Sequence, residues 1–209
     1  MKFGKTLIIG DSYSTFEGYI PKNYDTWYVS EKTEKTDVYK VEQTWWYQIF
    51  DGKDNKLMIN DSYSGATVCN SVRPEHTVDV SFVSRFEKLV NDGFFDNNEI
   101  DSVIVFGYTN DSWTNVSFGN EKYSNFKKED LLEFCPAVCY LAAKIKEVLP
   151  NANVLWLLNT DVDEKFPKAV KAIATHFEQK YLHFEDIDKL SGHPSVKGMK
   201  QIAEAIKNL

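Results

Sequence analysis

The chain has 209 residues, of which 43% are hydrophobic, and it carries a formal net charge of −7. This length suits one domain with a full hydrophobic core, and the composition is ordinary for a soluble globular protein. The acidic balance argues against a nucleic-acid-binding protein, which would carry a basic face. No apolar run has the length of a membrane helix, and the run at the N-terminus is too short for a signal peptide. We therefore expect a cytoplasmic protein that binds neither nucleic acid nor membrane.

Short apolar runs alternate along the chain with stretches of helical periodicity. The apolar runs predict strands at Thr6–Ile9, Leu57–Ile59, Val103–Phe106, Val154–Leu158 and Tyr181–Phe184. The periodic stretches predict helices at Thr44–Phe50, Phe82–Val90, Leu131–Val148, Phe166–Lys180 and Val196–Leu209. Such alternation is typical of a parallel sheet covered by helices on both faces. The sequence thus predicts a single α/β domain over residues 1–209, a three-layer α/β/α sandwich with a five-stranded parallel sheet of the flavodoxin-like type.

Polar residues follow the ends of the expected strands, where sheets of this kind hold their sites. The first strand is followed by GDSYS, the second by NDSYSGATV, the third by GYTNDSW and the fifth by EDIDKLSGHPS. The string Asp-Ser-Tyr-Ser occurs in both of the first two blocks. Only one of these blocks is expected to hold a reactive serine.

The four blocks, taken together and in this order, resemble the SGNH (GDSL) hydrolase superfamily from Thr6 to Ala205. The resemblance implies hydrolysis of carboxylic esters without a metal or a cofactor. It assigns the nucleophile to Ser12, the general base to His193, and the donors that face the oxyanion to Gly65 and Asn110. Ser62 in the second block is then structural, and Gly65 is the functional residue there.

These residue types suit the chemistry that the resemblance implies. A serine hydroxyl is a poor nucleophile until a neighbouring imidazole removes its proton during attack. His193 would act first as the base and then as the acid that protonates the leaving alcohol. The N–H groups of Ser12 and Gly65 and the side-chain amide of Asn110 would stabilise the oxyanion. Asp11 is interpreted as a turn-former that bonds nearby backbone.

The last block departs from the family pattern, which places an aspartate three residues before the histidine. That position holds Leu190, so we expect Asp188 to fold back and orient the ring of His193. The alternative is a Ser–His dyad in which a backbone carbonyl orients the ring. Asp161 and Asp163, beyond the fourth strand, are weaker candidates for the same role.

The segment Gly18–Val41 is long for a loop and rich in aromatic residues, which suggests a lid or a binding loop. We assign substrate contacts to Trp27 and Tyr28 in this segment and to Tyr13 beside the nucleophile. Aromatic faces among hydrogen-bonding groups suit sugars, so the expected substrate is a small-molecule ester with a short acyl group, chiefly acetyl, including esters of carbohydrates. The alternative interpretation of these aromatics is that they cover a core edge.

Two other functions remain open at this point. One is a lysophospholipase or thioesterase of the same fold, and the other is a binding module that has kept the fold without activity. The three cysteines, Cys69, Cys135 and Cys139, are interpreted as buried reduced thiols. The sequence does not give the oligomeric state.

Overall fold

The computed structural model describes residues 2–50, 55–70 and 80–209. Its main sheet has five parallel strands: β1 (Gly4–Gly10), β2 (Asn55–Ser62), β3 (Ser102–Phe106), β4 (Asn153–Leu158) and β5 (Lys180–His183). Their order in the sheet is β2-β1-β3-β4-β5, which is the order of the flavodoxin-like fold. The predicted fold class is therefore confirmed, with each expected strand in its place.

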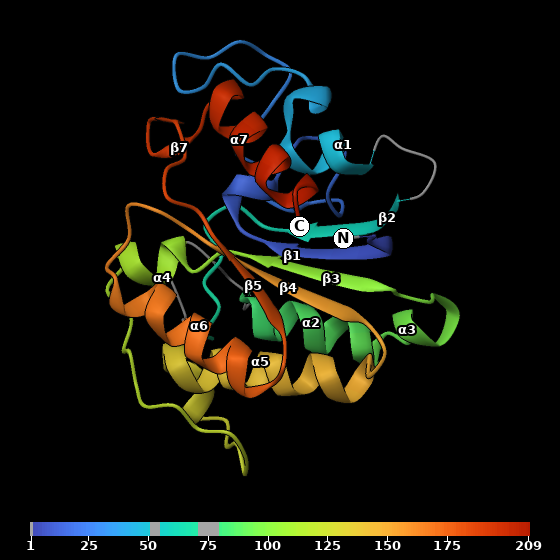
Figure 1. Ribbon diagram of the computed structural model, residues 1–209, viewed down its shortest axis with the longest axis vertical. Coiled ribbons are helices and arrows are strands. Elements are labelled where there is room, and N and C mark those ends of the chain that lie inside the picture. Colours follow the sequence, from blue (N-terminus) through green and yellow to red (C-terminus); the bar gives the residue numbers. More distant parts are fainter. Residues whose placement is uncertain (1, 51–54, 71–79) are drawn as a thin grey trace.

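Helices cover both faces of the sheet (Figure 1). One face carries α1 (Trp45–Phe50) and α7 (Val196–Lys207), and the other carries α2 (Phe82–Asn91), α5 (Phe134–Val148) and α6 (Lys165–His176). The short helices α3 (Phe94–Asn97) and α4 (Thr109–Trp113) follow α2 and β3. Single 3₁₀ turns occur at Ser12–Ser14, Val41–Gln43 and Asp130–Leu132. The last of these separates Leu131 from α5, so that the predicted helix begins three residues later than expected.

Side chains of the three central strands alternate between two hydrophobic clusters. The cluster under α2, α5 and α6 contains Leu7, Ile9, Val103, Val105, Val154 and Trp156. The cluster under α1 and α7 contains Ile8, Ile104, Phe106, Leu155 and Leu157. Because both faces are buried, each strand reads in the sequence as a continuous apolar run rather than as an alternating one.

A second, two-stranded sheet lies just before α7. It pairs β6 (Lys189–Leu190) with β7 (His193–Pro194) in antiparallel fashion. The two residues between them, Ser191 and Gly192, have φ angles of 49° and 77°. Positive φ at both central positions is the geometry of a tight hairpin turn, which glycine adopts without strain. This hairpin fixes the direction in which His193 leaves the turn.

Close packing around the strand ends explains several small residues. A Cβ on Gly10 would lie 2.5 Å from Ser62 Oγ, and one on Gly107 would lie 2.1 Å from the Phe82 ring. Glycine at position 107 therefore lets the ring of Phe82 pack against the backbone. Cys69, Cys135 and Cys139 are buried and are not joined by disulfides, as predicted. No helix within the described ranges has the length and apolar character needed to span a bilayer.

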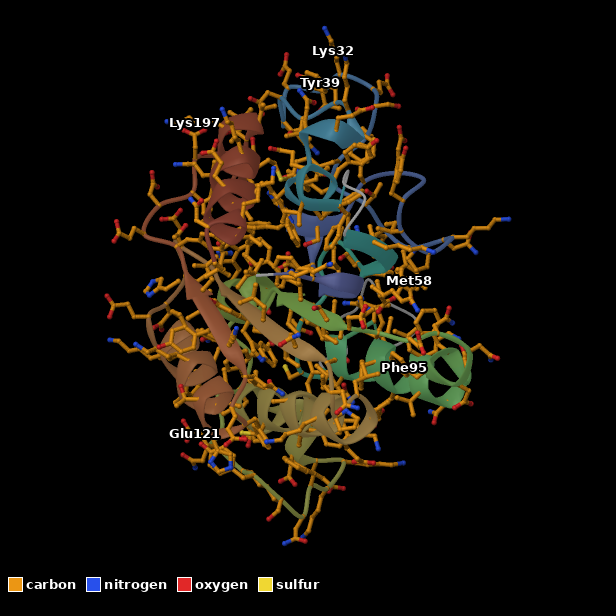
Figure 2. The ribbon with its side chains drawn as sticks, turned by 45° about the vertical axis from the view of Figure 1, so that its right-hand side comes forward. Lys32, Tyr39, Met58, Phe95, Glu121 and Lys197 are labelled. Atoms are coloured by element: carbon orange, nitrogen blue, oxygen red, sulfur yellow. The ribbon has the colours of Figure 1, made fainter. Side chains whose placement is uncertain are left out.

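The segment between Thr15 and Lys40 contains no helix and no named strand, only an isolated bridge between Thr33 and Thr36. It passes over the end of the molecule that carries α7 and α1 (Figure 1). Lys32 and Tyr39 of this segment lie at the same end as Lys197 of α7 (Figure 2). The carboxylate of Asp37 accepts a hydrogen bond of 2.9 Å from the N–H of Val196, the first residue of α7. The segment is thus attached to the helix that follows His193.

Candidate active site

Ser12 and His193 lie together although 181 residues separate them in the chain. Ser12 opens the 3₁₀ turn that follows β1, and Asp11 caps this turn by accepting a hydrogen bond of 3.0 Å from the N–H of Tyr13. The Oγ of Ser12 lies 2.9 Å from Nε2 of His193. Ser12 is only 3% exposed and His193 only 6%, so that little water reaches the pair.

The second ring nitrogen of His193 fixes the tautomer. Its Nδ1 lies 3.0 Å from the carbonyl oxygen of Ser191. A carbonyl oxygen can only accept, so Nδ1 carries the hydrogen and Nε2 presents its lone pair to the Ser12 hydroxyl. The pKa of His193 is lowered to about 4, mainly by burial and to a smaller extent by the charge of Lys189, while the bond to Ser191 opposes the shift. The imidazole is therefore neutral, and able to accept a proton, at neutral pH.

Asp188 does not orient His193, and this expectation is corrected. Its carboxylate accepts a hydrogen bond from the Ser195 hydroxyl and pairs with Lys197 Nζ at 3.4 Å. The bond from Ser195 is the main reason why the pKa of Asp188 lies below its ordinary value. The β6–β7 hairpin turns the chain away after Asp188, which leaves this residue facing the first turn of α7.

The other carboxylates considered for His193 have different partners. Asp161 pairs with Lys189 Nζ at 3.0 Å, and Asp163 pairs with Lys165 Nζ at 3.4 Å. Among the described residues, none of these three carboxylates bonds to the imidazole. The arrangement is therefore a Ser–His pair oriented by a backbone carbonyl.

The N–H groups of the two residues expected to face the oxyanion, Ser12 and Gly65, are available as donors. Neither the N–H of Ser12 nor that of Gly65 donates a hydrogen bond to any described residue. Gly65 has a φ of 86°, a conformation that side chains disfavour. Asn110, in α4, donates one amide hydrogen to the carbonyl of Ala66 at 2.9 Å, and its second amide hydrogen has no partner in the described part of the chain. These groups are the kind of donors that stabilise an oxyanion.

Two buried charged residues that were not predicted from the sequence hold this region. The first, Asp111, accepts hydrogen bonds from the N–H groups of Val68, at 2.9 Å, and of Cys69, at 3.3 Å. Burial raises its pKa to about 6. These bonds fix the backbone of the segment that follows Gly65.

The second, Arg85, holds the ends of the first two strands. Its Nη1 pairs with Asp61 at 2.9 Å, and its Nη2 donates to the carbonyl of Gly10 at 2.9 Å. The side chain is 3% exposed. The sequence carried one signal for this role: Arg85 is a charged residue on the apolar face of a predicted helix, three residues after Phe82.

Asp11 has the structural role that was predicted for it. It bonds the backbone of the turn and is fully buried, and burial raises its pKa to about 7. The bond from the N–H of Tyr13 opposes this rise. Asp11 thus shapes the turn that presents Ser12.

Tyr13 and Tyr28 do not face a substrate, which corrects a second expectation. Both are completely buried. The hydroxyl of Tyr13 donates to the carbonyl of Gly192 at 2.6 Å, and that of Tyr28 donates to the carbonyl of Pro194 at 2.8 Å. The two tyrosines therefore hold the backbone on either side of His193.

Aromatic rings surround the imidazole. The half-buried ring of Trp27 stacks on His193 with centroids 3.6 Å apart and planes at 7°. Trp113, at the end of α4, meets the imidazole edge to face at 6.0 Å and is 47% exposed. Trp113 was not predicted as a site residue, although it stands three residues after Asn110. The exposed aromatic ring beside His193 thus comes from α4, whereas it was expected from the sequence in the segment Gly18–Val41.

The second Asp-Ser-Tyr-Ser string is part of the scaffold. The hydroxyl of Ser62 is buried and donates to Asn60 Oδ1 at 2.6 Å. The N–H of Ser64 donates to the carbonyl of Asp25 at 2.9 Å. Ser62 and Ser64 of this block thus bond within the fold.

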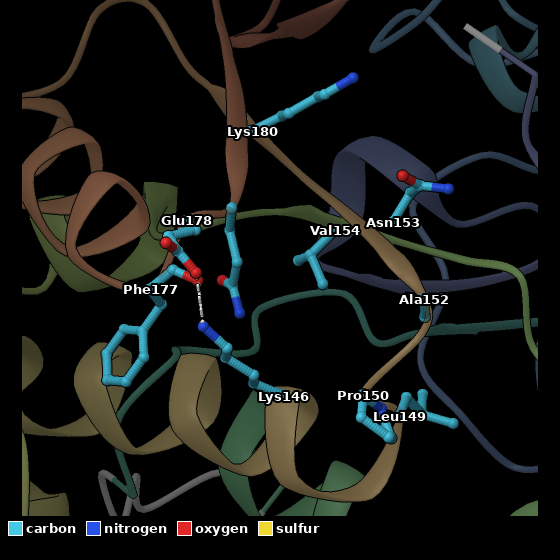
Figure 3. Close-up of a pocket in the computed structure, with 10 residues that line it drawn as sticks. Lys146, Leu149, Pro150, Ala152, Asn153, Val154, Phe177, Glu178 and Lys180 are labelled. Carbon is cyan, nitrogen blue, oxygen red and sulfur yellow. Dashed lines mark hydrogen bonds and ion pairs between the residues drawn. The ribbon is translucent and has the colours of Figure 1, made fainter.

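Cavities also lie outside this pair, and two of them are at the ends of β4 and β5. One, of about 760 Å³, is found beyond the carboxyl ends of β4 and β5, where Asn159, Asp161 and His183 line it. The other, of about 220 Å³, lies at the opposite ends of the same strands, and Figure 3 shows the ion pair of Lys146 with Glu178 beside it. In the described ranges no three histidine, cysteine or acidic side chains gather as a metal-binding cluster.

Comparisons with known proteins place this geometry in context. The model of the family described as GDSL-like Lipase/Acylhydrolase matches residues 5–209. A crystal structure described as a GDSL-like lipase from Bacteroides ovatus ATCC 8483 is 40% identical, with a TM-score of 0.88, and the match covers 100% of this chain and 98% of that one. A second, from Bacteroides uniformis ATCC 8492, is 36% identical, also with a TM-score of 0.88, and the match covers 99% and 94%.

More distant structures share the fold. An acetyl xylan esterase from the rumen bacterium Butyrivibrio proteoclasticus is 16% identical with a TM-score of 0.54, and the match covers 98% of this chain and 63% of that one. The search of curated proteins found no match to the chain.

Proposed function

The chain belongs to the GDSL-like lipase/acylhydrolase family of carboxylic ester hydrolases, and we propose that it is a serine esterase that cleaves acetyl and other short acyl esters. The observation that carries this proposal is the contact of 2.9 Å between Ser12 Oγ and His193 Nε2, with Nδ1 bonded to a carbonyl. This is the geometry required of a nucleophile and its general base. The reaction proceeds through an acyl-enzyme on Ser12.

The first step transfers the acyl group to the enzyme. His193 Nε2 takes the proton from Ser12 Oγ while this oxygen bonds to the carbonyl carbon of the ester. The electron pair of the carbonyl moves onto its oxygen, and the N–H groups of Ser12 and Gly65 and the free amide hydrogen of Asn110 stabilise that charge. Collapse of the intermediate breaks the bond to the alcohol, which leaves with the proton from Nε2.

The second step releases the acid. Water attacks the acyl-enzyme while His193 takes one of its protons, and a second oxyanion forms in the same place. Collapse then breaks the bond to Ser12 Oγ, which regains a proton from Nε2. The enzyme returns to its starting state with no metal or cofactor in either step.

The proposed substrate class rests on the surroundings of the pair. Trp113 offers an exposed aromatic face beside His193, and Leu190, the cross-strand partner of His193, is 41% exposed. An exposed aromatic face suits a sugar ring, and one distant structural neighbour is described as an acetyl xylan esterase. We therefore propose an acetylated carbohydrate as the substrate of this site.

The test is hydrolysis of p-nitrophenyl esters from acetyl to octanoyl by the wild type and two variants. We expect the acetyl ester to be the fastest, Ser12→Ala to abolish turnover, and Ser62→Ala to keep most of it, because Ser62 bonds only within the scaffold. Faster turnover of the octanoyl ester would favour a lysophospholipase or thioesterase. Absence of turnover on every ester would favour a binding module.

A further inference from the structure

His193 lacks the carboxylate that usually orients such a ring, so its position has to be fixed in another way. The carbonyl of Ser191 supplies one hydrogen bond to Nδ1. A single hydrogen bond in the ring plane restrains the position of Nδ1 but leaves the plane free to rock about that bond. A rocking ring would move Nε2 away from Ser12 Oγ, and proton transfer depends steeply on this alignment.

The indole of Trp27 is placed to stop this motion. It lies against the imidazole face, with centroids 3.6 Å apart and an angle of 7° between the planes. Tyr13 and Trp113 touch the ring at tilted angles of 57° and 75°, with centroids 5.4 Å and 6.0 Å away. Trp27 is thus the aromatic ring that lies parallel to the imidazole.

The backbone around Trp27 is itself anchored to the site. The N–H of Trp27 donates to Thr15 Oγ1 at 2.9 Å, three residues after the nucleophile. The next residue, Tyr28, donates its hydroxyl to the carbonyl of Pro194, the residue after His193. Trp27 therefore contacts His193, and Tyr28 contacts Pro194. The two neighbouring contacts together keep the indole aligned with the imidazole.

We propose that Trp27 is a positioning residue that takes the place of the missing carboxylate. Its indole holds the imidazole plane so that Nε2 faces Ser12, and it covers one face of the ring against water. This inference rests on the proposed function, because it assigns Trp27 a role in the same proton transfer. It differs from the expectation that Trp27 holds the substrate.

The two roles predict different kinetics. Loss of a positioning residue lowers kcat, since the alignment matters in the transition state, whereas loss of a substrate platform raises KM. The charge of Lys189 also acts on the imidazole and lowers its pKa. Removing the indole admits water to the ring, which moves the pKa of His193 up towards its ordinary value.

The experiment compares Trp27→Leu and Trp27→Phe with the wild type on p-nitrophenyl acetate. We expect Trp27→Leu to lower kcat by about 10- to 100-fold with KM within about threefold, and Trp27→Phe to recover most of the loss. Tyr19→Ala is the matched control, because Tyr19 belongs to the same segment, is exposed, and packs on Phe16 and Trp46 rather than on His193. It should retain wild-type kcat.

A second readout does not require turnover. An NMR titration follows the His193 ring, which is identified by the signal that disappears in His193→Gln. Its pKa should rise in Trp27→Leu and remain low in Tyr19→Ala. An unchanged kcat, a change in KM alone, or an unchanged titration in Trp27→Leu would overturn the inference. If the wild type hydrolyses no ester, the proposed function fails, while the titration still tests the stacked pair.

Discussion

The carboxylate of Asp188 accepts a hydrogen bond from the hydroxyl of Ser195, the N-cap residue of α7. Ser195 in turn accepts a hydrogen bond of 3.1 Å from the N–H of Gly198, so that the three residues form one chain of bonds at the start of the helix. Asp188 therefore supports the helix that follows His193 and not the imidazole itself.

Asp188→Ala should for this reason affect stability more than catalysis. We expect kcat/KM to fall by less than about tenfold and the melting temperature to fall measurably, because the Ser195 hydroxyl loses its acceptor. Thermal denaturation and hydrolysis of p-nitrophenyl acetate check the two halves. A loss of about 10⁴-fold, as when a full triad loses its acid, would mean that Asp188 reaches His193 during the reaction.

The fold was predictable because its strands are buried on both faces. A continuous apolar run such as Val103–Phe106 predicts a central strand, and a strand is found at each of the five predicted runs. Helix boundaries were less certain, since a 3₁₀ turn and a separate helix both fit the periodicity near Leu131. The blocks that contain Ser12 and His193 were recognisable because both stand at strand or hairpin ends.

The partners of the site residues were harder to predict. Whether Asp188 reaches His193 depends on the hairpin at Ser191 and Gly192. The positive φ values of these two residues are set by the tertiary structure and not by the local sequence. The hydroxyls of Tyr13 and Tyr28 bond carbonyls that lie 179 and 166 residues away, and nothing in the local sequence distinguishes such a buried tyrosine from a substrate-facing one.

Asn110→Ala should lower kcat on p-nitrophenyl acetate by about 10²- to 10³-fold with little change in KM. The amide acts on charge that develops only in the transition state. Asn98→Ala is the matched control, because Asn98 also donates to a backbone carbonyl, that of Phe94, outside the site. Equal kinetic effects of the two variants would show that Asn110 acts only through the scaffold.

The acid limb in the pH profile of kcat/KM should lie at low pH. His193 must be neutral to accept the proton of Ser12, and burial lowers its pKa from 6.5 to about 4. Activity should therefore remain high as the pH falls to about 5 and should be lost below about pH 4. An acid limb centred near 6.5 would contradict a buried imidazole.

Asp11 provides a control for this profile, since burial raises its pKa to about 7. Any step near pH 7 that disappears in Asp11→Asn belongs to Asp11. The acid limb of His193 should remain in that variant.

Trp113→Ala should separate sugar esters from simple esters. We expect KM for an acetylated xylo-oligosaccharide to rise about tenfold, while kcat on p-nitrophenyl acetate stays within about threefold, because Trp113 offers an exposed face beside the site. Steady-state kinetics on both substrates measure this. If both substrates lose turnover equally, Trp113 serves the imidazole and not the sugar.

The most direct test of the account is the labelling of the enzyme by a fluorophosphonate, which reacts with activated serines and stays attached. Intact-mass measurement and peptide mapping locate the label while esterase activity is followed in the same sample. We predict one label per chain, on the peptide that contains Ser12, with activity lost in proportion and no labelling of Ser12→Ala. Labelling at Ser62, or full activity in a protein labelled at Ser12, would contradict the account.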